Sequence, residues 1–142
     1  MPIKKKKGIT EAQLDRVFSQ LVRSIYPEIC HSCGAKLPKK ELQCCHFISR
    51  RIRCVRWDLR NCLPGCAKCN LFTPEHIWEL GKKINEYYGY DTASDLMTRS
   101  KQNTCKVSAF ERKQMFDVFT KALTLEPTEE LRNNIINMTK LI

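Results

Sequence analysis

The chain has 142 residues, of which 42% are hydrophobic and 28% charged, a length and composition that suit one folded domain and exclude wholesale disorder. Its 25 basic and 15 acidic side chains leave a formal net charge of +10, which favours a polyanionic partner such as nucleic acid. No apolar run approaches the roughly eighteen residues that a membrane span needs, and none follows the N-terminal lysines, so we expect a cytoplasmic protein without membrane contact.

The N-terminal residues 1–9 contain the run Lys4–Lys7 and predict a disordered basic arm. The next stretch predicts a helix over residues 10–26. There Thr10 and Gln13 form a capping box, and apolar residues recur behind them at helical spacing.

The single domain expected over residues 10–142 changes character at residues 28–72, which are rich in cysteine and arginine and are interrupted by glycine and proline. Within this core, ELQCCHFIS (41–49) and CVRWDL (54–59) each predict a strand, and CAKCNLF (66–72) predicts a short helix.

Residues 73–142 return to helical patterns, with a capping residue before each segment. Thr73 followed by Pro74 begins the first of these helices. The later helices are capped by Asp91 or Thr92, by Ser108 with Glu111, and by Thr128. We therefore expect an α+β fold that is mostly helical.

The chain has nine cysteines, and the spacing of four of them indicates a metal site. CHSCG and CAKCN supply Cys30, Cys33, Cys66 and Cys69, two Cys-x-x-Cys pairs of the kind that bind structural Zn²⁺ through four thiolates. Such an ion would clamp two distant segments together. Cys44, Cys54, Cys62 and Cys105 are interpreted as small buried side chains, because disulfides are rare in a cytoplasmic chain.

A histidine and two asparagines follow one another in this core. His46 is followed fifteen residues later by Asn61, and Asn70 directly follows the last zinc cysteine, which is the residue order of the HNH motif. The segment VRWDLRNCLPGCAKCN (55–70), preceded by CHSCG and CHF, resembles the NinG/Rap recombination nuclease family of lambdoid phages. The zinc frame and trailing asparagine also resemble phage endonuclease VII resolvases, more loosely.

This resemblance implies a zinc-bound ββα-metal (HNH) core with flanking helices. It also implies a metal-dependent DNA endonuclease that acts on branched recombination intermediates such as Holliday junctions and D-loops. His-activated water would hydrolyse the phosphodiester and leave 5′-phosphate and 3′-hydroxyl ends. Two symmetric cuts in a junction would require a homodimer, and a phage-encoded enzyme would work in the cytoplasm of its bacterial host.

The resemblance assigns roles to three residues of the motif. His46 would be the general base, and Asn61 would orient it through hydrogen bonds across the loop. Asn70 would bind a catalytic Mg²⁺ or Mn²⁺ through its amide oxygen. The zinc would hold this geometry without taking part in the reaction.

The position before His46 departs from the family pattern, which has glycine there and an acidic residue three places before the histidine. This chain has Cys45 and Gln43 instead. Cys45 is either a small buried residue in place of glycine or a catalytic-metal ligand that selects a softer ion, such as Mn²⁺ or Zn²⁺. A third interpretation is a weakened site whose carboxylate comes from Asp58 or from another chain.

Arginines cluster between the histidine and the first asparagine. The expected phosphate contacts are Arg50, Arg51, Arg53, Arg56 and Arg60, and a solvated loop is the other interpretation. The alternative function is a catalytically weak or inactive zinc-stabilised DNA-binding recombination protein, which the departures from the family pattern favour.

Overall fold

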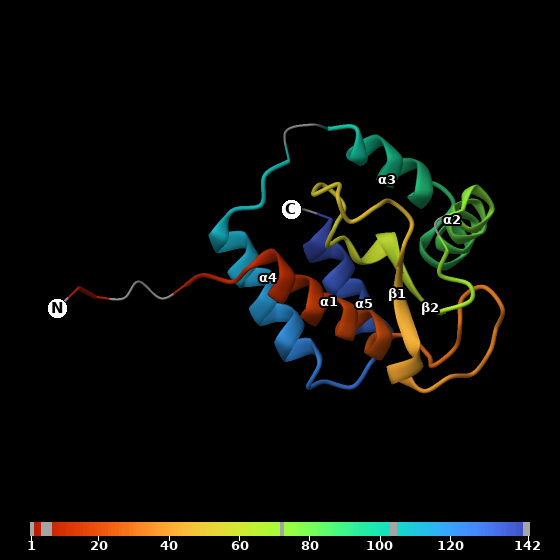
Figure 1. Ribbon diagram of the computed structural model, residues 1–142, viewed down its shortest axis with the longest axis horizontal. Coiled ribbons are helices and arrows are strands. Elements are labelled where there is room, and N and C mark those ends of the chain that lie inside the picture. The colour runs from red at the N-terminus through yellow and green to blue at the C-terminus, as the bar shows by residue number, and fades with distance from the viewer. Residues whose placement is uncertain (1, 4–6, 72, 103–104, 141–142) are drawn as a thin grey trace.

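The computed structural model describes residues 2–3, 7–71, 73–102 and 105–140 and shows a small α+β fold (Figure 1). Five α-helices and one two-stranded sheet make up the regular structure of these residues, with short 3₁₀ turns before the strands. Their bounds are α1 Glu11–Ile25, β1 Leu42–His46, β2 Cys62–Cys66, α2 Pro74–Tyr88, α3 Thr92–Ser100, α4 Ala109–Ala122 and α5 Glu129–Thr139. Within the described ranges, no helix has both the length and the apolar character that crossing a membrane requires.

The helices begin at their predicted caps. Thr10 forms the predicted capping box with Gln13, so the N-terminal helix predicted for residues 10–26 is confirmed as α1. Asp91 precedes α3 without a side-chain capping hydrogen bond, whereas at the other four helices the side-chain oxygen of the cap accepts a backbone N–H that the first turn leaves unpaired. Side-chain caps are formed by Thr10, Thr73, Ser108 and Thr128.

The predicted basic arm falls partly outside the described residues, which omit Lys4, Lys5 and Lys6. Ile9 already packs against the hydrophobic core, and its carbonyl accepts a 2.9 Å hydrogen bond from Nε of Arg112. The packed part of the chain therefore begins just before α1.

The second strand of the sheet is Cys62–Cys66, so its prediction at residues 54–59 was wrong. Residues 54–59 form turns, in which the N–H groups of Val55 and Asp58 donate to carbonyls three residues back at 3.2 and 3.3 Å. The side chain of Asp58 then accepts the backbone N–H of Arg60 at 3.0 Å. Local hydrogen bonds of this kind compete with a strand ladder, and the pattern of apolar residues does not reveal them.

The short helix predicted at residues 66–72 is also wrong over the part that the structure describes. A single turn stands there, in which the N–H groups of Cys69 and Asn70 both donate to the carbonyl of Cys66, at 3.1 and 3.0 Å. This tight turn brings two thiols to one side of the chain.

The two strands pair antiparallel, with His46 directly opposite Cys62. Directly opposite residues of an antiparallel pair share a face, as do alternate residues of one strand. Cys44, His46 and Cys62 therefore lie on the same side of the sheet. α1 covers this side, and the ring of its Phe18 has its centroid 6.3 Å from that of His46.

The other face of the sheet carries Cys45 and Gly65 and lies toward α2. A Cβ atom on Gly65 would come 2.6 Å from Sγ of Cys45 and 2.9 Å from the ring of His31. The His31 ring in turn has its centroid 5.8 Å from that of His76 on α2. The hairpin thus lies between α1 and α2 (Figure 1).

A disulfide joins Cys54 to Cys105, which corrects the prediction that both are unpaired small side chains. The two residues are 51 positions apart in the sequence, and their Cα atoms are 5.2 Å apart in the fold. The bond connects the loop after β1 to the segment before α4, a proximity that only the packing of the helices produces.

Asp58 anchors the loop between the strands, and its side chain is fully buried. Its Oδ2 accepts hydrogen bonds from Nη2 of Arg60 at 2.8 Å and from Nη1 of Arg99 at 2.7 Å. A buried carboxylate is stable only with such partners. The pairing ties the loop to α3.

Replacing Asp58 by alanine is expected to lower the free energy of unfolding by about 3–5 kcal/mol, because two largely buried guanidinium groups lose their counter-ion. Lys113 and Asp117 form an exposed 2.7 Å ion pair on α4. The matched control Asp117→Ala should therefore cost less than about 0.5 kcal/mol. Chemical denaturation in the presence of zinc measures both variants, and equal losses would contradict the anchoring role of Asp58.

Candidate functional site

The four cysteines predicted to bind zinc come together near one end of the hairpin. One sulfur from each of Cys30, Cys33, Cys66 and Cys69 lies within 4.8 Å of all the others, and the sulfurs of Cys33 and Cys66 are 3.9 Å apart. A tetrahedral Zn²⁺ with Zn–S bonds of about 2.3 Å holds its sulfur ligands about 3.8 Å apart. The tetrathiolate cluster, as we call these four residues, is thus compatible with structural zinc.

Backbone hydrogen bonds position the first cysteine pair against the sheet. Gly34 closes the turn, because its N–H donates to the carbonyl of Cys30 at 3.0 Å and its φ of 74° is a conformation that glycine adopts readily. The next contact is to Pro64 of β2, whose carbonyl accepts the backbone N–H of His31 at 3.0 Å and lies 2.9 Å from the ring Nδ1. Both cysteine pairs are therefore attached to the same strand.

The pKa values of two thiols in the cluster are shifted in opposite directions. Burial raises the pKa of Cys69 to about 12, and its hydrogen bond with Cys66 adds to the shift. Burial also acts to raise the pKa of Cys30, but hydrogen bonds from backbone groups, Cys33 first among them, outweigh it and lower that pKa to about 7. A dication would stabilise all four thiolates at neutral pH.

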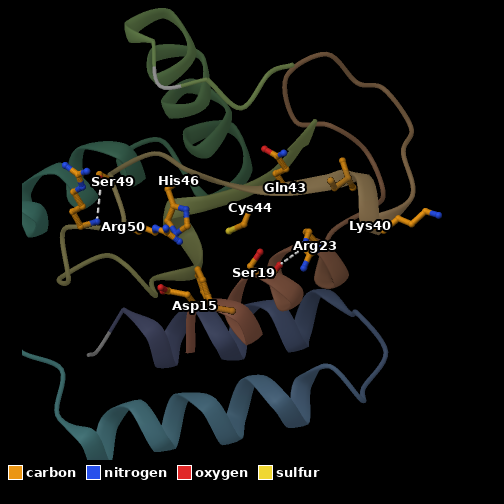
Figure 2. A pocket seen from close by; sticks show the side chains of 12 residues that line it. Asp15, Ser19, Arg23, Lys40, Gln43, Cys44, His46, Ser49 and Arg50 are labelled. Atoms are coloured by element: carbon orange, nitrogen blue, oxygen red, sulfur yellow. Dashed lines mark hydrogen bonds between the residues drawn. The ribbon is translucent and has the colours of Figure 1, made fainter. Parts of the chain in front are cut away.

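A cleft of about 880 Å³ lies between α1 and β1 (Figure 2). Four basic side chains and one carboxylate line it, so we call it the basic cleft. Its lining residues are Asp15, Phe18, Ser19, Arg23, Lys40, Leu42, Gln43, Cys44, His46, Ser49, Arg50 and Arg51.

His46, at the end of β1, is the histidine of the basic cleft (Figure 2). Burial lowers the pKa of its imidazole to about 4; the charge of Arg50 acts in the same direction, and that of Asp15 opposes it. The ring is therefore neutral at physiological pH. A neutral imidazole can accept a proton or bind a metal ion.

Cys44 and Cys62 lie beside His46 and form with it a second group of possible metal ligands. One atom from each of the three lies within 4.8 Å of the other two. Burial raises the pKa of the Cys62 thiol, and the neighbouring Cys44 adds to the shift.

Asn61 is fully buried and ties together the loop that follows His46. Its Oδ1 accepts the N–H of Ile48 at 2.8 Å, and its Nδ2 donates to the carbonyls of Ile48 and Val55 at 2.9 and 3.2 Å. Its own carbonyl accepts the N–H of Phe47 at 2.9 Å. Asn61 therefore fixes the backbone next to His46.

Asn70 lies toward the other end of β1. Its Nδ2 donates to Oε1 of Gln43 at 2.8 Å, and Gln43 precedes His46 by three residues, about 10 Å along a strand. Asn70 is not among the residues that line the basic cleft. Gln43 borders the basic cleft, but strand alternation places its side chain on the Cys45 face of β1, opposite His46. The structure therefore does not bring Asn70 to His46.

Cys45 is fully buried on the opposite face of β1 from His46, against Gly65. Burial raises the pKa of its thiol. Within the described residues it belongs to neither group of possible metal ligands. This placement matches the interpretation of Cys45 as a small buried residue in place of glycine.

The five arginines of the predicted phosphate-binding cluster have two kinds of surroundings. Arg50 and Arg51 line the basic cleft, whereas Arg53, Arg56 and Arg60 form ion pairs within the chain. Nε of Arg53 and Nη2 of Arg56 lie 2.8 and 2.6 Å from carboxylates of α1. These ion pairs hold the loop between the strands against the first helix.

The donors around His46 do not fit the Mg²⁺ or Mn²⁺ that the family resemblance implies. Asp15 supplies the one carboxylate among the residues lining the cleft, and its oxygens already accept hydrogen bonds of 2.6–3.0 Å from Arg56 and Trp57. The donors grouped with the imidazole are sulfur atoms, which hard cations bind poorly. A soft ion fits this donor set.

Sequence reasoning did not identify Cys44 and Cys62 as possible metal ligands. Strand alternation alone places Cys44 on the same face as His46, so that signal was present. Cys62 joins them only through the register of the hairpin, and the second strand had been predicted at residues 54–59.

Comparisons of the chain with protein-family models, curated proteins and solved structures found no match. The resemblance to the NinG/Rap family therefore rests on the order and spacing of the motif residues.

Removing zinc with a chelator is expected to lower the melting temperature by roughly 10 °C or more, because metal binding at the tetrathiolate cluster contributes to folding. Cys30→Ser should melt low from the start and respond weakly to the chelator. The matched control Cys45→Ala should respond as the wild type does. Circular dichroism measures the melting, and a zinc-loaded wild type that melts unchanged with chelator would contradict the structural role of the ion.

Proposed function

We propose that the protein is a DNA endonuclease of the HNH type, which hydrolyses phosphodiesters in the basic cleft with His46 activating water. The observation that carries this proposal is the position of His46, whose neutral ring lines a cleft with four basic side chains. Basic side chains attract the DNA backbone, so a phosphate would be drawn to the face where the imidazole lies.

In this mechanism His46 accepts a proton from water while the water oxygen bonds to phosphorus and the bond from phosphorus to the 3′ oxygen breaks. The 3′ oxygen takes a proton from solvent, which leaves 3′-hydroxyl and 5′-phosphate ends. Arg50 and Arg51 bind the backbone. Asn61 is a positioning residue, since it orders the loop next to the imidazole.

The hairpin, the tetrathiolate cluster beside it and the helix that follows support an HNH-type core. The structural ion in this core is zinc. The family's catalytic Mg²⁺ or Mn²⁺ does not suit the sulfur-rich donors near His46, so Zn²⁺ belongs among the ions to be tested.

The proposed substrate is branched DNA, such as a Holliday junction or D-loop, and the proposed assembly is a homodimer that makes paired cuts. The exposed aromatic side chains Trp78 on α2 and Phe110 on α4, 68% and 70% exposed, are available to such an interface. Single exposed apolar side chains also occur on monomers, so the dimer rests on the requirement for paired cuts.

A zinc-stabilised DNA-binding protein without catalysis is the second candidate. The placement of Asn70 beside Gln43, away from His46, favours it, because the resemblance assigns the two residues to one reaction centre. A zinc-bound protein-interaction module is a third possibility, and it would show no salt-dependent DNA binding.

We expect the wild type to nick a four-way DNA junction, and His46→Ala to nick it at least about 100-fold more slowly, because the water loses its proton acceptor. Both proteins should bind the junction equally. The matched control His76→Ala, on α2, should cut like the wild type. The assay compares the junction with a linear duplex of the same sequence, with Mg²⁺, Mn²⁺ or Zn²⁺.

Junction binding without cutting under any of these ions would replace the endonuclease with the non-catalytic DNA-binding protein. Lack of salt-dependent binding to any DNA would exclude the endonuclease and the non-catalytic DNA-binding protein, and would leave the protein-interaction module.

Arg50→Ala combined with Arg51→Ala is expected to weaken DNA binding and to reduce the slope of log K against log salt by about 1–2, since each lost phosphate contact removes about 0.9. Lys113→Ala with Lys121→Ala removes the same charge from α4, away from the cleft, and should change the slope less. Fluorescence anisotropy at several salt concentrations measures both. Equal changes in the two double variants would show that DNA is not bound at the basic cleft.

A further inference from the structure

We infer that Cys44, His46 and Cys62 form a second zinc site, separate from the tetrathiolate cluster, whose fourth coordination position opens into the basic cleft. The three ligand atoms lie within 4.8 Å of one another, and two of the three residues line that cleft.

The register of the hairpin creates this site. His46 ends β1 and Cys62 begins β2, directly opposite, while Cys44 lies two residues earlier on the same face. Tetrahedral zinc with bonds of about 2.3 Å to sulfur and 2.0 Å to nitrogen would hold these atoms about 3.5–3.8 Å apart. The three ligand atoms, none more than 4.8 Å from another, already lie close to that geometry.

The chemistry of the donors selects the ion. Two thiolates and one imidazole suit Zn²⁺ and do not suit Mg²⁺. The nearby carboxylate of Asp15 is held by the guanidinium of Arg56, at 2.6 and 3.0 Å, and by the indole of Trp57, at 3.0 Å. It therefore stays outside the ligand set, which has three protein ligands.

A zinc ion with three protein ligands keeps a position for water or substrate, whereas four thiolates close the coordination of a structural ion. The tetrathiolate cluster would thus hold a structural ion with closed coordination, and the second site would hold an ion with one open position. Two thiolates neutralise the charge of the second ion, and the basic side chains of the cleft, Arg50 among them, supply the attraction for an anion. The ligand class that fits the open position is water or a phosphate oxygen.

One consequence of this site rests on the proposed endonuclease function. His46 would activate water through the metal instead of accepting its proton directly. An ion held by Cys44, His46 and Cys62 would lower the pKa of a water molecule at the open position, so that the water could give its proton to solvent and attack phosphorus as the bond to the 3′ oxygen breaks. The 3′ oxygen then takes a proton from solvent.

The test counts metal in the full chain. The protein is purified with a reductant that does not bind metal, supplied with Zn²⁺, freed of excess ion by gel filtration and measured by plasma mass spectrometry. We expect about two zinc ions per chain in the wild type and about one in Cys44→Ala. Cys45→Ala removes the neighbouring thiol on the opposite face and should keep about two.

Three further measurements separate loss of the site from loss of the fold. Cys44→His replaces one zinc ligand with another and should restore the second ion. Substitution with Co²⁺ should give a set of thiolate-to-cobalt absorption bands that Cys44→Ala lacks and Cys45→Ala retains. Melting curves show whether each variant is folded. If Cys44→Ala is unfolded, the zinc count and the cobalt spectrum of the wild type test the second site.

About one zinc ion per chain in the loaded, reduced wild type would overturn the second site. So would equal counts in folded Cys44→Ala and Cys45→Ala. A wild type with both ions that cuts no DNA would keep the site and reject the endonuclease. A wild type that binds one zinc ion per chain and cuts DNA would reject the second site and keep the endonuclease.

Discussion

The pairing of β1 with β2 is the constraint on which the rest of this structure depends. Side chains alternate between the two faces of a strand, so a shift of β2 by one residue would move Cys62 away from His46 and turn the side chains of β2 to the opposite faces. The contact between His31 and the carbonyl of Pro64, together with the tetrathiolate cluster, holds β2 from outside the sheet. A metal ion at this cluster would stabilise the register of the hairpin.

Ion pairs within the chain decide which basic groups face outward. The arginines nearest α1 are bound to its carboxylates, and Asp58 is bound by two others. These pairs stabilise the long loop between the strands. The same pairing occupies Asp15, the one carboxylate among the lining residues, so the cleft presents a net positive charge. The ion pairs that stabilise the loop are therefore also the contacts that leave the cleft with its positive charge.

His46 has two possible uses, and they exclude each other at a single nitrogen atom. A free imidazole can take a proton from water, and a zinc-bound imidazole cannot. Both uses need a neutral ring, which its burial against Phe18 of α1 provides. The choice between them depends on whether Cys44 and Cys62 hold an ion beside it.

The sequence alone determined the helix starts, the first strand and the four cysteines of the tetrathiolate cluster. These features depend on local hydrogen bonds, on side-chain periodicity or on short Cys-x-x-Cys turns, all of which lie within a few residues of the chain. It also placed Cys44 and Cys45 on opposite faces of one strand, because alternation is local.

Only the tertiary structure decided the position of β2, the disulfide between Cys54 and Cys105, and the grouping of Cys62 with His46. It also separated the arginines that bind carboxylates from those that line the cleft. The physical reason is that each of these features joins groups that are distant in sequence. These contacts depend on how α1 and the loop pack against the hairpin, and no local sequence pattern indicates that packing.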